Sequence, residues 1–311
     1  MIMSHTLIQL LDAEFDEIHV AAPHSTVSLA ERMPEVKSVT PLNIQHGQLA
    51  FGERWRAGRD ISRLQADAAY VLPNSWKSAL LPFFAGVPRR VGWHGEARYV
   101  LLNERYTGVE KHPLMIERFM ALSGALPDQP YPKPRLEVDE DNRRRLINDL
   151  HLEPTNVVAL APGAEFGQAK KWPVEYYAAI AETMVSRGKQ VWLFGSPGDV
   201  NDCDAIAQSV PNVTNLAGKT SLLDAIDLLS VAAQLVCNDS GLMHVGSALG
   251  VPTIGVFGST SPNFTPPLGE HCEVVELELD CRPCFARVCP LGHTKCLHDL
   301  KPERVLERIA S

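Results

Sequence analysis

Residues 234–257 read QLVCNDSGLMHVGSALGVPTIGVF, and they indicate the fold class of the second half of the chain. The apolar run at residues 234–237 predicts a buried strand, residues 242–249 have helical spacing, and residues 253–257 predict another strand. A strand, a helix and a strand in direct succession indicate a β-α-β unit with parallel strands and a right-handed crossover.

The same alternation continues through the rest of the second half. Four further segments follow it, two predicted strands at residues 156–161 and 190–194 and two predicted helices at residues 172–187 and 222–231. Pro173 suits the first turn of the earlier helix, and Gly188 suits its C-terminal cap. A short amphipathic helix at residues 302–309 is expected to end the chain.

The first half follows a looser version of the pattern, with strand-like runs at residues 17–21 and 68–72. Residues 124–134 contain four prolines within eight positions, which excludes a helix or a central strand there. We therefore expect a linker at this stretch. The expected fold is α/β, with two Rossmann-like, doubly wound domains at residues 1–135 and 136–311.

The composition excludes several classes of protein. A chain of 311 residues with 45% hydrophobic content is long enough for two cored domains and too apolar to be disordered. Seven cysteines are too few for a disulfide scaffold, and charges or prolines interrupt every apolar run before it reaches membrane-spanning length. The start of the chain does not resemble a secretory signal, so we expect a cytosolic protein.

The charge of the chain is unevenly distributed. The formal net charge of −8 argues against a nucleic-acid partner. Residues 51–100 nevertheless carry eight basic and four acidic side chains. This local excess is either a site for an anionic partner or a solvated helix face.

The start of the chain departs from the doubly wound pattern. Residues 3–11 have helical spacing and precede the first strand-like run, whereas such a domain normally opens with a strand that lies near its centre. We expect that the chain lacks its true first strand, through truncation or a misassigned start, and that the sheet of this domain has a gap in its middle. A domain that begins with a helix is the alternative.

Residues 161–173, APGAEFGQAKKWP, lie between a predicted strand and the N-terminus of a predicted helix. Small residues keep the backbone accessible, and Lys170 and Lys171 immediately precede the helix. Helix N–H groups together with a mobile ammonium suit a phosphate, while an ordinary polar loop with exposed lysines is the alternative. No complete Walker A motif is present, because Val213 occupies the position of its first glycine.

A second polar segment follows the first strand of the opening β-α-β unit. Asp239 or Ser240 is suited to cap the next helix, and Gly241 leaves room for a ligand at the first-turn N–H groups. His244 lies one turn further along, and residues 258–262, GSTSP, follow the next strand. Three loops at the carboxyl ends of neighbouring parallel strands form a typical crevice site, so we expect the second half to bind a nucleotide or a phosphosugar.

These segments resemble those of the ADP-heptose:lipopolysaccharide heptosyltransferases, glycosyltransferase family 9. The resemblance covers nearly the whole chain in order and is carried by residues 162–173 and 238–244, by VLPNSWKSALLPFFAG at residues 71–86, and by FTPP at residues 264–267. It implies a GT-B architecture, in which an N-terminal acceptor domain and a C-terminal donor domain face a cleft.

The resemblance further implies an inverting transfer of heptose from ADP-heptose to the first heptose of the lipopolysaccharide inner core. No cofactor is required for that reaction. The implied partners are ADP-heptose and the Kdo-lipid A inner core, reached by peripheral contact with the cytoplasmic face of the membrane. The alternatives are another GT-B transferase with a different nucleotide sugar, and a non-catalytic protein that binds ADP-sugars.

Individual residues receive roles from the same resemblance. Lys170 matches the lysine that binds the donor phosphates, and Asp239 matches the carboxylate that holds the donor heptose; these are the two implied catalytic side chains. Ser240, Gly241 and His244 match the helix start that binds the pyrophosphate. The other implied residues are Thr220, as a contact to adenine, and the acceptor residues Asn74, Ser75, Lys77, Arg90 and Arg118.

One departure from the family pattern concerns the general base. Family members open with a strand and a loop that carries Gly-Asp, whose aspartate is the base, and Met1 corresponds to a position just after that loop. The base is therefore expected upstream of Met1. We expect a chain without it to be weakly active or inactive, since a general base contributes about 10²–10⁴-fold.

Four cysteines near the C-terminus have a spacing of their own, C-x₂-C-x₄-C-x₆-C, at Cys281, Cys284, Cys289 and Cys296. This spacing does not match a standard zinc pattern, in which two close pairs of cysteines occur. We expect a structural thiol cluster, with bound zinc as the alternative.

Overall fold

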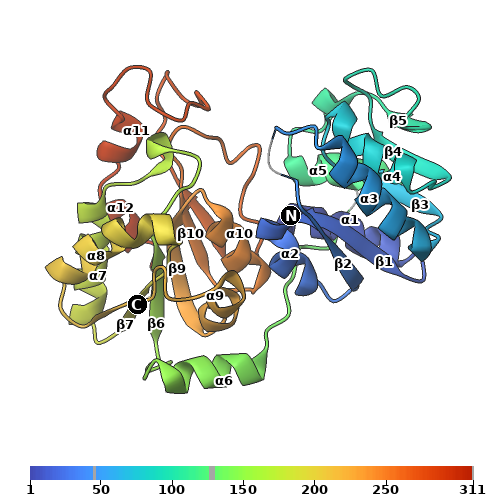
Figure 1. The fold of residues 1–311 in the computed structure, drawn as a ribbon. Coiled ribbons are helices and arrows are strands. Elements are labelled where there is room, and N and C mark those ends of the chain that lie inside the picture. The colour runs from blue at the N-terminus through green and yellow to red at the C-terminus, as the bar shows by residue number, and fades with distance from the viewer. Residues whose placement is uncertain (45–46, 126–129, 310–311) are drawn as a thin grey trace. The chain divides into compact units, whose positions relative to one another are not determined.

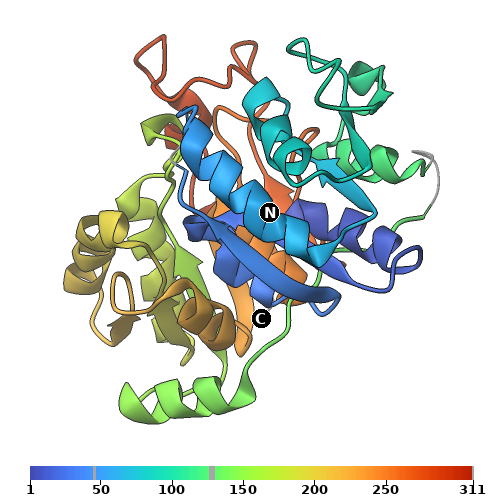
Figure 2. The same ribbon diagram turned by 45° about the vertical axis from the view of Figure 1, so that its right-hand side comes forward.

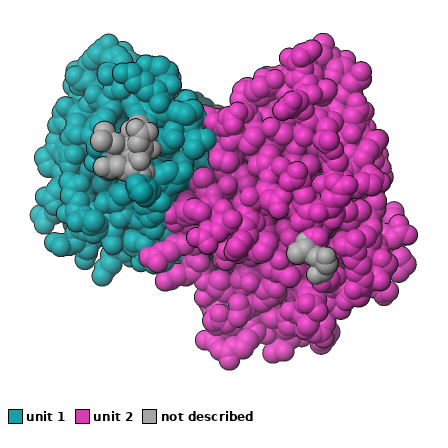
Figure 3. Space-filling view, turned by 180° about the vertical axis from the view of Figure 1, so that it is seen from behind, with its two compact units in different colours: residues 1, 3–132 teal, residues 2, 133–311 magenta. Residues whose placement is uncertain are grey.

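The computed structural model describes residues 1–44, 47–125 and 130–309, and the chain forms two units (Figure 3). The first unit consists of residues 1 and 3–132, and the second of residues 2 and 133–311. The change from one unit to the other falls inside the proline-rich stretch 124–134, of which residues 126–129 lie outside the described part of the chain.

A six-stranded parallel sheet forms the centre of the second unit (Figure 1). Its strands are β6 Val157–Ala161, β7 Gln190–Leu193, β8 Val213–Asn215, β9 Ala232–Asn238, β10 Thr253–Val256 and β11 Cys272–Val275. Their order is β11-β10-β9-β6-β7-β8, so the winding direction reverses between β6 and β9. The four strands predicted in this half are confirmed, whereas the short edge strands β8 and β11 are absent from the prediction.

Helices connect the strands of this sheet in the expected alternation. The second unit contains α6 Glu140–Asp149, α7 Val174–Ser186, α8 Val200–Ser209, α9 Leu222–Leu229, α10 Gly241–Ala248, α11 Lys295–His298 and α12 Glu303–Leu306. Helices α7, α9 and α10 confirm the three predicted helices, with ends that differ by one or two residues. Two details of the prediction are wrong: Pro173 is the N-cap residue of α7 and has extended ψ, and the terminal helix α12 has only four residues.

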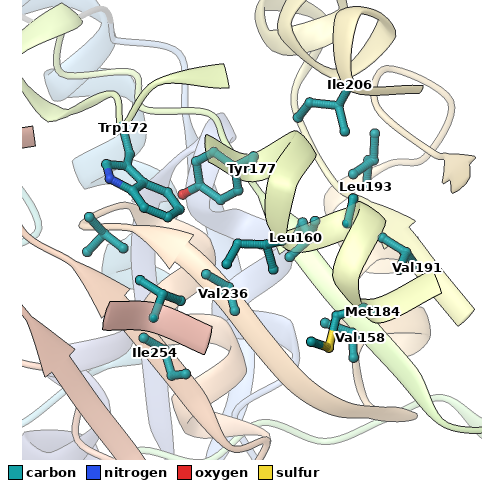
Figure 4. Close-up of a cluster of buried hydrophobic side chains, with 14 of the residues drawn as sticks. Val158, Leu160, Trp172, Tyr177, Met184, Val191, Leu193, Ile206, Val236 and Ile254 are labelled. Atoms are coloured by element: carbon teal, nitrogen blue, oxygen red, sulfur yellow. The ribbon is translucent and has the colours of Figure 1, made fainter. Parts of the chain in front are cut away.

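The core of the second unit explains why its central strands have mainly apolar sequences. Every residue of β6 is buried, because side chains from both faces of the sheet are covered. Figure 4 shows Trp172 and Tyr177 in this cluster. Their ring centroids lie 5.1 Å apart in edge-to-face contact. The Trp172 indole donates to the Leu300 carbonyl at 2.8 Å, which ties the start of α7 to the C-terminal segment.

The first unit has its parallel strands in two separate sheets (Figure 1). One sheet pairs β1 Ile18–Pro23 with β2 Val36–Leu42, and the other orders β3 Ala68–Val71, β4 Arg89–Trp93 and β5 Glu104–Tyr106. Within the described residues no strand ladder joins the two, in agreement with the expected gap. The helices of this unit are α1 His5–Asp12, α2 His24–Glu31, α3 Phe51–Ile61, α4 Leu80–Phe84 and α5 Met115–Met120.

Candidate functional site

The site lies at the carboxyl edge of the six-stranded sheet, where the winding direction reverses. The chain leaves β6 through the loop that contains Lys170, and it leaves the neighbouring β9 at Asp239. The next strand outward, β10, continues into residues 258–260. Because all these strands are parallel, their three following loops emerge at one edge, which is the usual ligand-binding position in such sheets.

Lys170 and Asp239 form an ion pair at this edge. The ammonium Nζ of Lys170 lies 2.6 Å from Oδ2 of Asp239, and the Thr260 hydroxyl donates to the same Oδ2 at 2.6 Å. Asp239 is buried, and its backbone amide donates to the Val256 carbonyl at 3.0 Å. The structure therefore brings together the two implied catalytic side chains, and it adds Thr260, which was not predicted.

Asn238 fixes the relative position of two of these loops. Its Oδ1 accepts from the backbone amide of Trp172 at 3.1 Å and from the Tyr177 hydroxyl at 3.0 Å. Its Nδ2 donates to the Pro162 carbonyl at 2.6 Å. A fully buried amide that spans both sides of the β6 loop holds that loop in register with the end of β9. Only its place beside Asp239 in the motif indicated a role for this residue.

The start of α10 is open to a ligand. Ser240 is the N-cap residue with extended backbone, and its side chain makes no capping hydrogen bond. A Cβ atom placed on Gly241, the first residue of the helix, would meet no atom within 4 Å. Helix N–H groups at such an end attract anions, so this position fits the expected phosphate site.

His244 lies on α10 one turn from its start and is partly buried. Burial lowers the pKa of His244 to about 4, although the nearby Asp239 carboxylate acts in the opposite direction. The imidazole is therefore neutral near pH 7. It can donate one hydrogen bond to a ligand but does not supply a positive charge.

Arg282, from the cysteine-rich segment, holds the loop after β10 in place. Its guanidinium donates to the carbonyls of Gly258 at 2.6 Å and Thr260 at 3.0 Å, and it pairs with Glu276 at 2.7 Å. These bonds position Thr260, which in turn contacts Asp239. Nothing in the local sequence pattern pointed to this arginine, because it acts through backbone atoms of a distant loop.

The aromatic ring of Phe166 lies next to the Lys170 ammonium. The ring centroid of Phe166 lies 4.9 Å from Nζ of Lys170 and 5.3 Å from the guanidinium carbon of Arg287. The Arg287 carbonyl also accepts the amide of Ala169 at 3.1 Å. The cysteine-rich segment therefore supports the loop after β6 as well as the loop after β10.

The implied adenine contact, Thr220, lies in the loop after β8, just before α9. Its hydroxyl donates to the Leu216 carbonyl at 3.4 Å, and the following Ser221 caps α9 through its side chain. Since β8 is separated from β6 by β7, this loop emerges further along the same edge of the sheet. Its role as an adenine contact stays a prediction.

The implied acceptor residues belong to the first unit, and the structure gives most of their side chains local partners. Asn74, Ser75 and Lys77 follow β3; Asn74 is exposed, Ser75 is hydrogen-bonded to Ser78, and Lys77 donates to the Gly47 carbonyl. Arg90 donates to the carbonyls of Val87 and Leu101, and Arg118 of α5 donates to that of His112. Their contact with an acceptor stays a prediction.

All seven cysteines are free thiols. Among the described residues, no three side chains of the kinds that bind metals are grouped as a metal site would require. Backbone amides of residues 291–294, with that of Thr294 foremost, lower the pKa of the Cys289 thiol, whereas burial raises that of Cys296. Four of the seven, Cys281, Cys284, Cys289 and Cys296, belong to the segment that carries Arg282.

Comparison with known proteins identifies the family of the chain. The model of glycosyltransferase family 9 (heptosyltransferase) matches residues 54–295. The lipopolysaccharide heptosyltransferase 2 of Salmonella typhimurium is 40% identical over 328 residues, which cover 100% of this chain and 94% of that protein. The lipooligosaccharide heptosyltransferase 2 of Haemophilus influenzae is 38% identical and covers 99% of this chain and 94% of its own length.

Solved structures show the same fold. The ADP-heptose lipopolysaccharide heptosyltransferase II of Escherichia coli superposes with a TM-score of 0.86 at 38% identity, over 99% of this chain and 93% of that one. The E. coli heptosyltransferase WaaC with ADP shares the fold at 20% identity, with a TM-score of 0.73 over 98% and 94%. The two Rossmann-like units thus define a glycosyltransferase of the GT-B class. The chain belongs to glycosyltransferase family 9, the heptosyltransferases.

Proposed function

We propose that this chain transfers heptose from ADP-heptose to the first heptose of the lipopolysaccharide inner core, with inversion at the anomeric carbon. The full-length similarity to heptosyltransferases 2 supports heptose transfer in lipopolysaccharide synthesis. The observation that carries the choice of a diphosphate-linked donor is the combination of the Lys170–Asp239–Thr260 cluster with the open start of α10. The adenine base of the donor is assigned from the family resemblance.

The cluster of Lys170, Asp239 and Thr260 can bind a sugar diphosphate if Lys170 and Asp239 exchange their mutual contact for contacts with the ligand. A phosphate at the start of α10 attracts the Lys170 ammonium, which lies 2.6 Å from Asp239. The Asp239 carboxylate then accepts hydrogen bonds from hydroxyls of the donor sugar, while Thr260 keeps it oriented. When the donor binds, the Lys170 ammonium therefore contacts its phosphate, and the Asp239 carboxylate contacts its sugar.

The same groups assist the displacement. In an inverting reaction the acceptor hydroxyl attacks the anomeric carbon, gives up its proton to a base, and the bond to the diphosphate breaks. Negative charge accumulates on the departing ADP, where Lys170 and the amides of Ser240 and Gly241 stabilise it. His244 donates a hydrogen bond to the same diphosphate. No metal or other cofactor is assigned a step in this scheme.

The resemblance supports the remaining assignments. Thr220 contacts adenine, and Asn74, Ser75, Lys77, Arg90 and Arg118 contact the acceptor. The acceptor is the Kdo-lipid A inner core, so the enzyme works from the cytosol in peripheral contact with the membrane. Among the described residues no helix is both long and apolar enough to cross a membrane.

A donor panel tests the proposal. The chain is incubated with a Kdo-lipid A acceptor that already carries one heptose, and with ADP-heptose, ADP-glucose, UDP-glucose or GDP-mannose. Transfer from ADP-heptose alone, with inverted configuration of the product, is the expected result. Its rate should be low, because no residue of this chain is assigned as the general base. A preference for another nucleotide sugar would contradict the assigned donor, and ADP binding without any transfer would indicate a non-catalytic protein.

A further inference from the structure

Helix α3 of the first unit has its aromatic side chains on the outside. Phe51 and Trp55 are one turn apart on the same face and are 55% and 47% exposed, and Arg59 continues that face by one more turn. The buried positions of the same helix hold Arg54 and Gly58 instead. An ordinary surface helix places its apolar residues toward the core, so α3 has the reverse arrangement.

The inner face of α3 accounts for this reversal. A Cβ atom on Gly58 would lie 2.7 Å from Cβ of Phe84, so the glycine permits close packing of α3 on α4. The buried Arg54 donates to the Leu49 carbonyl at 2.7 Å rather than packing against apolar groups. The helix is therefore held by close backbone approach and hydrogen bonds. Trp55 is not needed for the core of this unit.

The exposed rings form one patch with basic groups at its border. Phe51 contacts Phe84 at a centroid distance of 5.1 Å, and Phe84 contacts Phe83, which is 41% exposed, at 6.0 Å. The guanidinium of Arg59 lies 5.2 Å from the Trp55 ring centroid. Figure 2 shows α3 as the light blue helix at the front of its unit. We name this set of residues, Phe51, Trp55, Arg59 and Phe83, the α3 patch.

We propose that the α3 patch docks the protein on the surface of an anionic phospholipid bilayer. This inference rests on the proposed function, because an acceptor that is built on a lipid is reached at a bilayer surface. It adds the particular surface through which the enzyme makes that contact. Trp and Phe side chains favour the membrane interface, and arginines beside them favour anionic headgroups.

The distribution of charge favours this region, rather than the rest of the chain, as the surface that meets an anionic bilayer. Residues 51–100 carry eight basic and four acidic side chains, whereas the whole chain has a net charge of −8. Of the eight, Arg54 and Arg98 are buried, so the other six can face a lipid surface. On α3 and the turn after it, Arg56, Arg59 and Arg63 are exposed, against Glu53 and Asp60. An anionic bilayer repels most of this protein and attracts this part of it, so the charge orients the patch toward the lipid.

Vesicle flotation tests the inference with the full chain. Vesicles of phosphatidylethanolamine with phosphatidylglycerol are compared with vesicles of phosphatidylcholine alone. We expect binding to the anionic vesicles that weakens with added salt, and a loss of about tenfold or more in the Phe51→Ser/Trp55→Ser double variant. The matched control is the double variant Val288→Ser/Leu291→Ser, which alters two residues of the second unit that are 71% and 60% exposed and should bind as the wild type does.

A second variant leaves the Phe51–Phe84 contact intact, so it separates vesicle binding from any effect on folding. Trp55→Phe keeps an aromatic ring at the surface, so it should bind vesicles like the wild type while losing the tryptophan quenching that brominated lipids cause. Unchanged quenching in this variant, or unchanged binding in the double serine variant, would overturn the proposal. Wild-type dimers that the serine substitutions dissociate, without vesicle binding, would identify the patch as a contact between copies and would also overturn it.

Transfer assays separate this inference from the proposed function. The double serine variant should transfer heptose to a deacylated, water-soluble acceptor at the wild-type rate and to a vesicle-borne acceptor about tenfold more slowly. Equal rates on both acceptors would contradict docking and leave heptose transfer established. If the wild type transfers heptose to neither acceptor, the proposed function fails, and flotation still decides whether the patch binds a bilayer.

Discussion

Lys170 and Asp239 lie on the two neighbouring strand-to-helix connections at which the sheet reverses its winding, and their side chains meet at 2.6 Å. Both charges are largely removed from water, so each depends on the other for its stabilisation. In the proposed reaction, a bound diphosphate would share the Lys170 ammonium with Asp239. Several measurable consequences depend on this relationship.

Removal of the Lys170 ammonium should impair turnover more than donor binding. In Lys170→Ala we expect turnover to fall by about 10²–10³-fold, since one stabilising group for the leaving diphosphate is lost. The unfolding free energy should fall by about 1–3 kcal/mol because the buried Asp239 loses a partner. Steady-state kinetics and chemical denaturation measure the two effects.

The adjacent lysine provides the matched control for that experiment. Lys171 pairs with Asp202 at 2.7 Å and with Asp199 at 3.5 Å, away from Asp239. Lys171→Ala should therefore keep its turnover number within about twofold, as expected for a salt bridge outside the chemistry. An unchanged turnover number in Lys170→Ala would remove Lys170 from the catalytic groups.

The Thr260 hydroxyl should matter for the orientation of Asp239. Thr260→Val removes a charge-assisted hydrogen bond of 2.6 Å at nearly constant volume, and it should cost about 1.5–3 kcal/mol of unfolding free energy. Thr260→Ser retains the hydroxyl and should recover most of that loss. Thermal or urea unfolding of both variants gives the comparison, and equal stability of valine and serine variants would show that the bond contributes nothing.

A substitution at Gly241 tests whether the start of α10 binds a ligand. A methyl group there meets no protein atom within 4 Å, so Gly241→Ala should leave the unfolding free energy within about 0.5 kcal/mol of the wild type. It should nevertheless weaken ADP binding about tenfold or more, because the methyl group occupies the space at the first-turn amides.

Gly246 of the same helix provides a control in which an alanine substitution should affect stability. A Cβ atom on Gly246 would lie 2.5 Å from a methyl carbon of Leu235, so Gly246→Ala should destabilise the fold by about 1–3 kcal/mol. Wild-type ADP affinity in a stable Gly241→Ala protein would mean that the diphosphate binds elsewhere.

His244 should make stability depend on pH below neutrality. Its pKa is about 4 in the folded protein and about 6.5 in an unfolded chain. Between these values the unfolded chain binds more protons, so the stability that is present above pH 6.5 is lost as the pH falls toward 4. The loss should be about 2–3 kcal/mol, and denaturant titrations at several pH values measure it.

A glutamine variant isolates this contribution. His244→Gln has no group that titrates at this position, so its unfolding free energy should vary less over the same pH range. Parallel pH profiles for the wild type and the variant would show that another group causes the loss of stability.

The second unit was largely predictable because its central strands are buried on both faces. The strands β6, β7, β9 and β10 therefore have mainly apolar sequences with clear ends. The edge strands β8 and β11 are only partly buried and have mixed sequences, so periodicity does not reveal them. In the first unit, β4 begins with two arginines, and the same limitation applies.

The site was predictable as far as its loops but not in its contacts. Parallel topology is enough to place Lys170 and Asp239 at one sheet edge. It does not show that they pair directly, nor that Thr260 completes the cluster. Arg282 was missed because it acts through the carbonyl groups of Gly258 and Thr260, and backbone contacts between distant loops leave no residue pattern.

Calorimetric titration of ADP into the wild type and Gly241→Ala tests the central claim most directly. If the start of α10 and Lys170 hold the diphosphate, the wild type binds ADP with a single site per chain, and the glycine variant binds it about tenfold or more weakly. Absence of ADP binding by the folded wild-type protein, or equal affinity in both proteins, would contradict it.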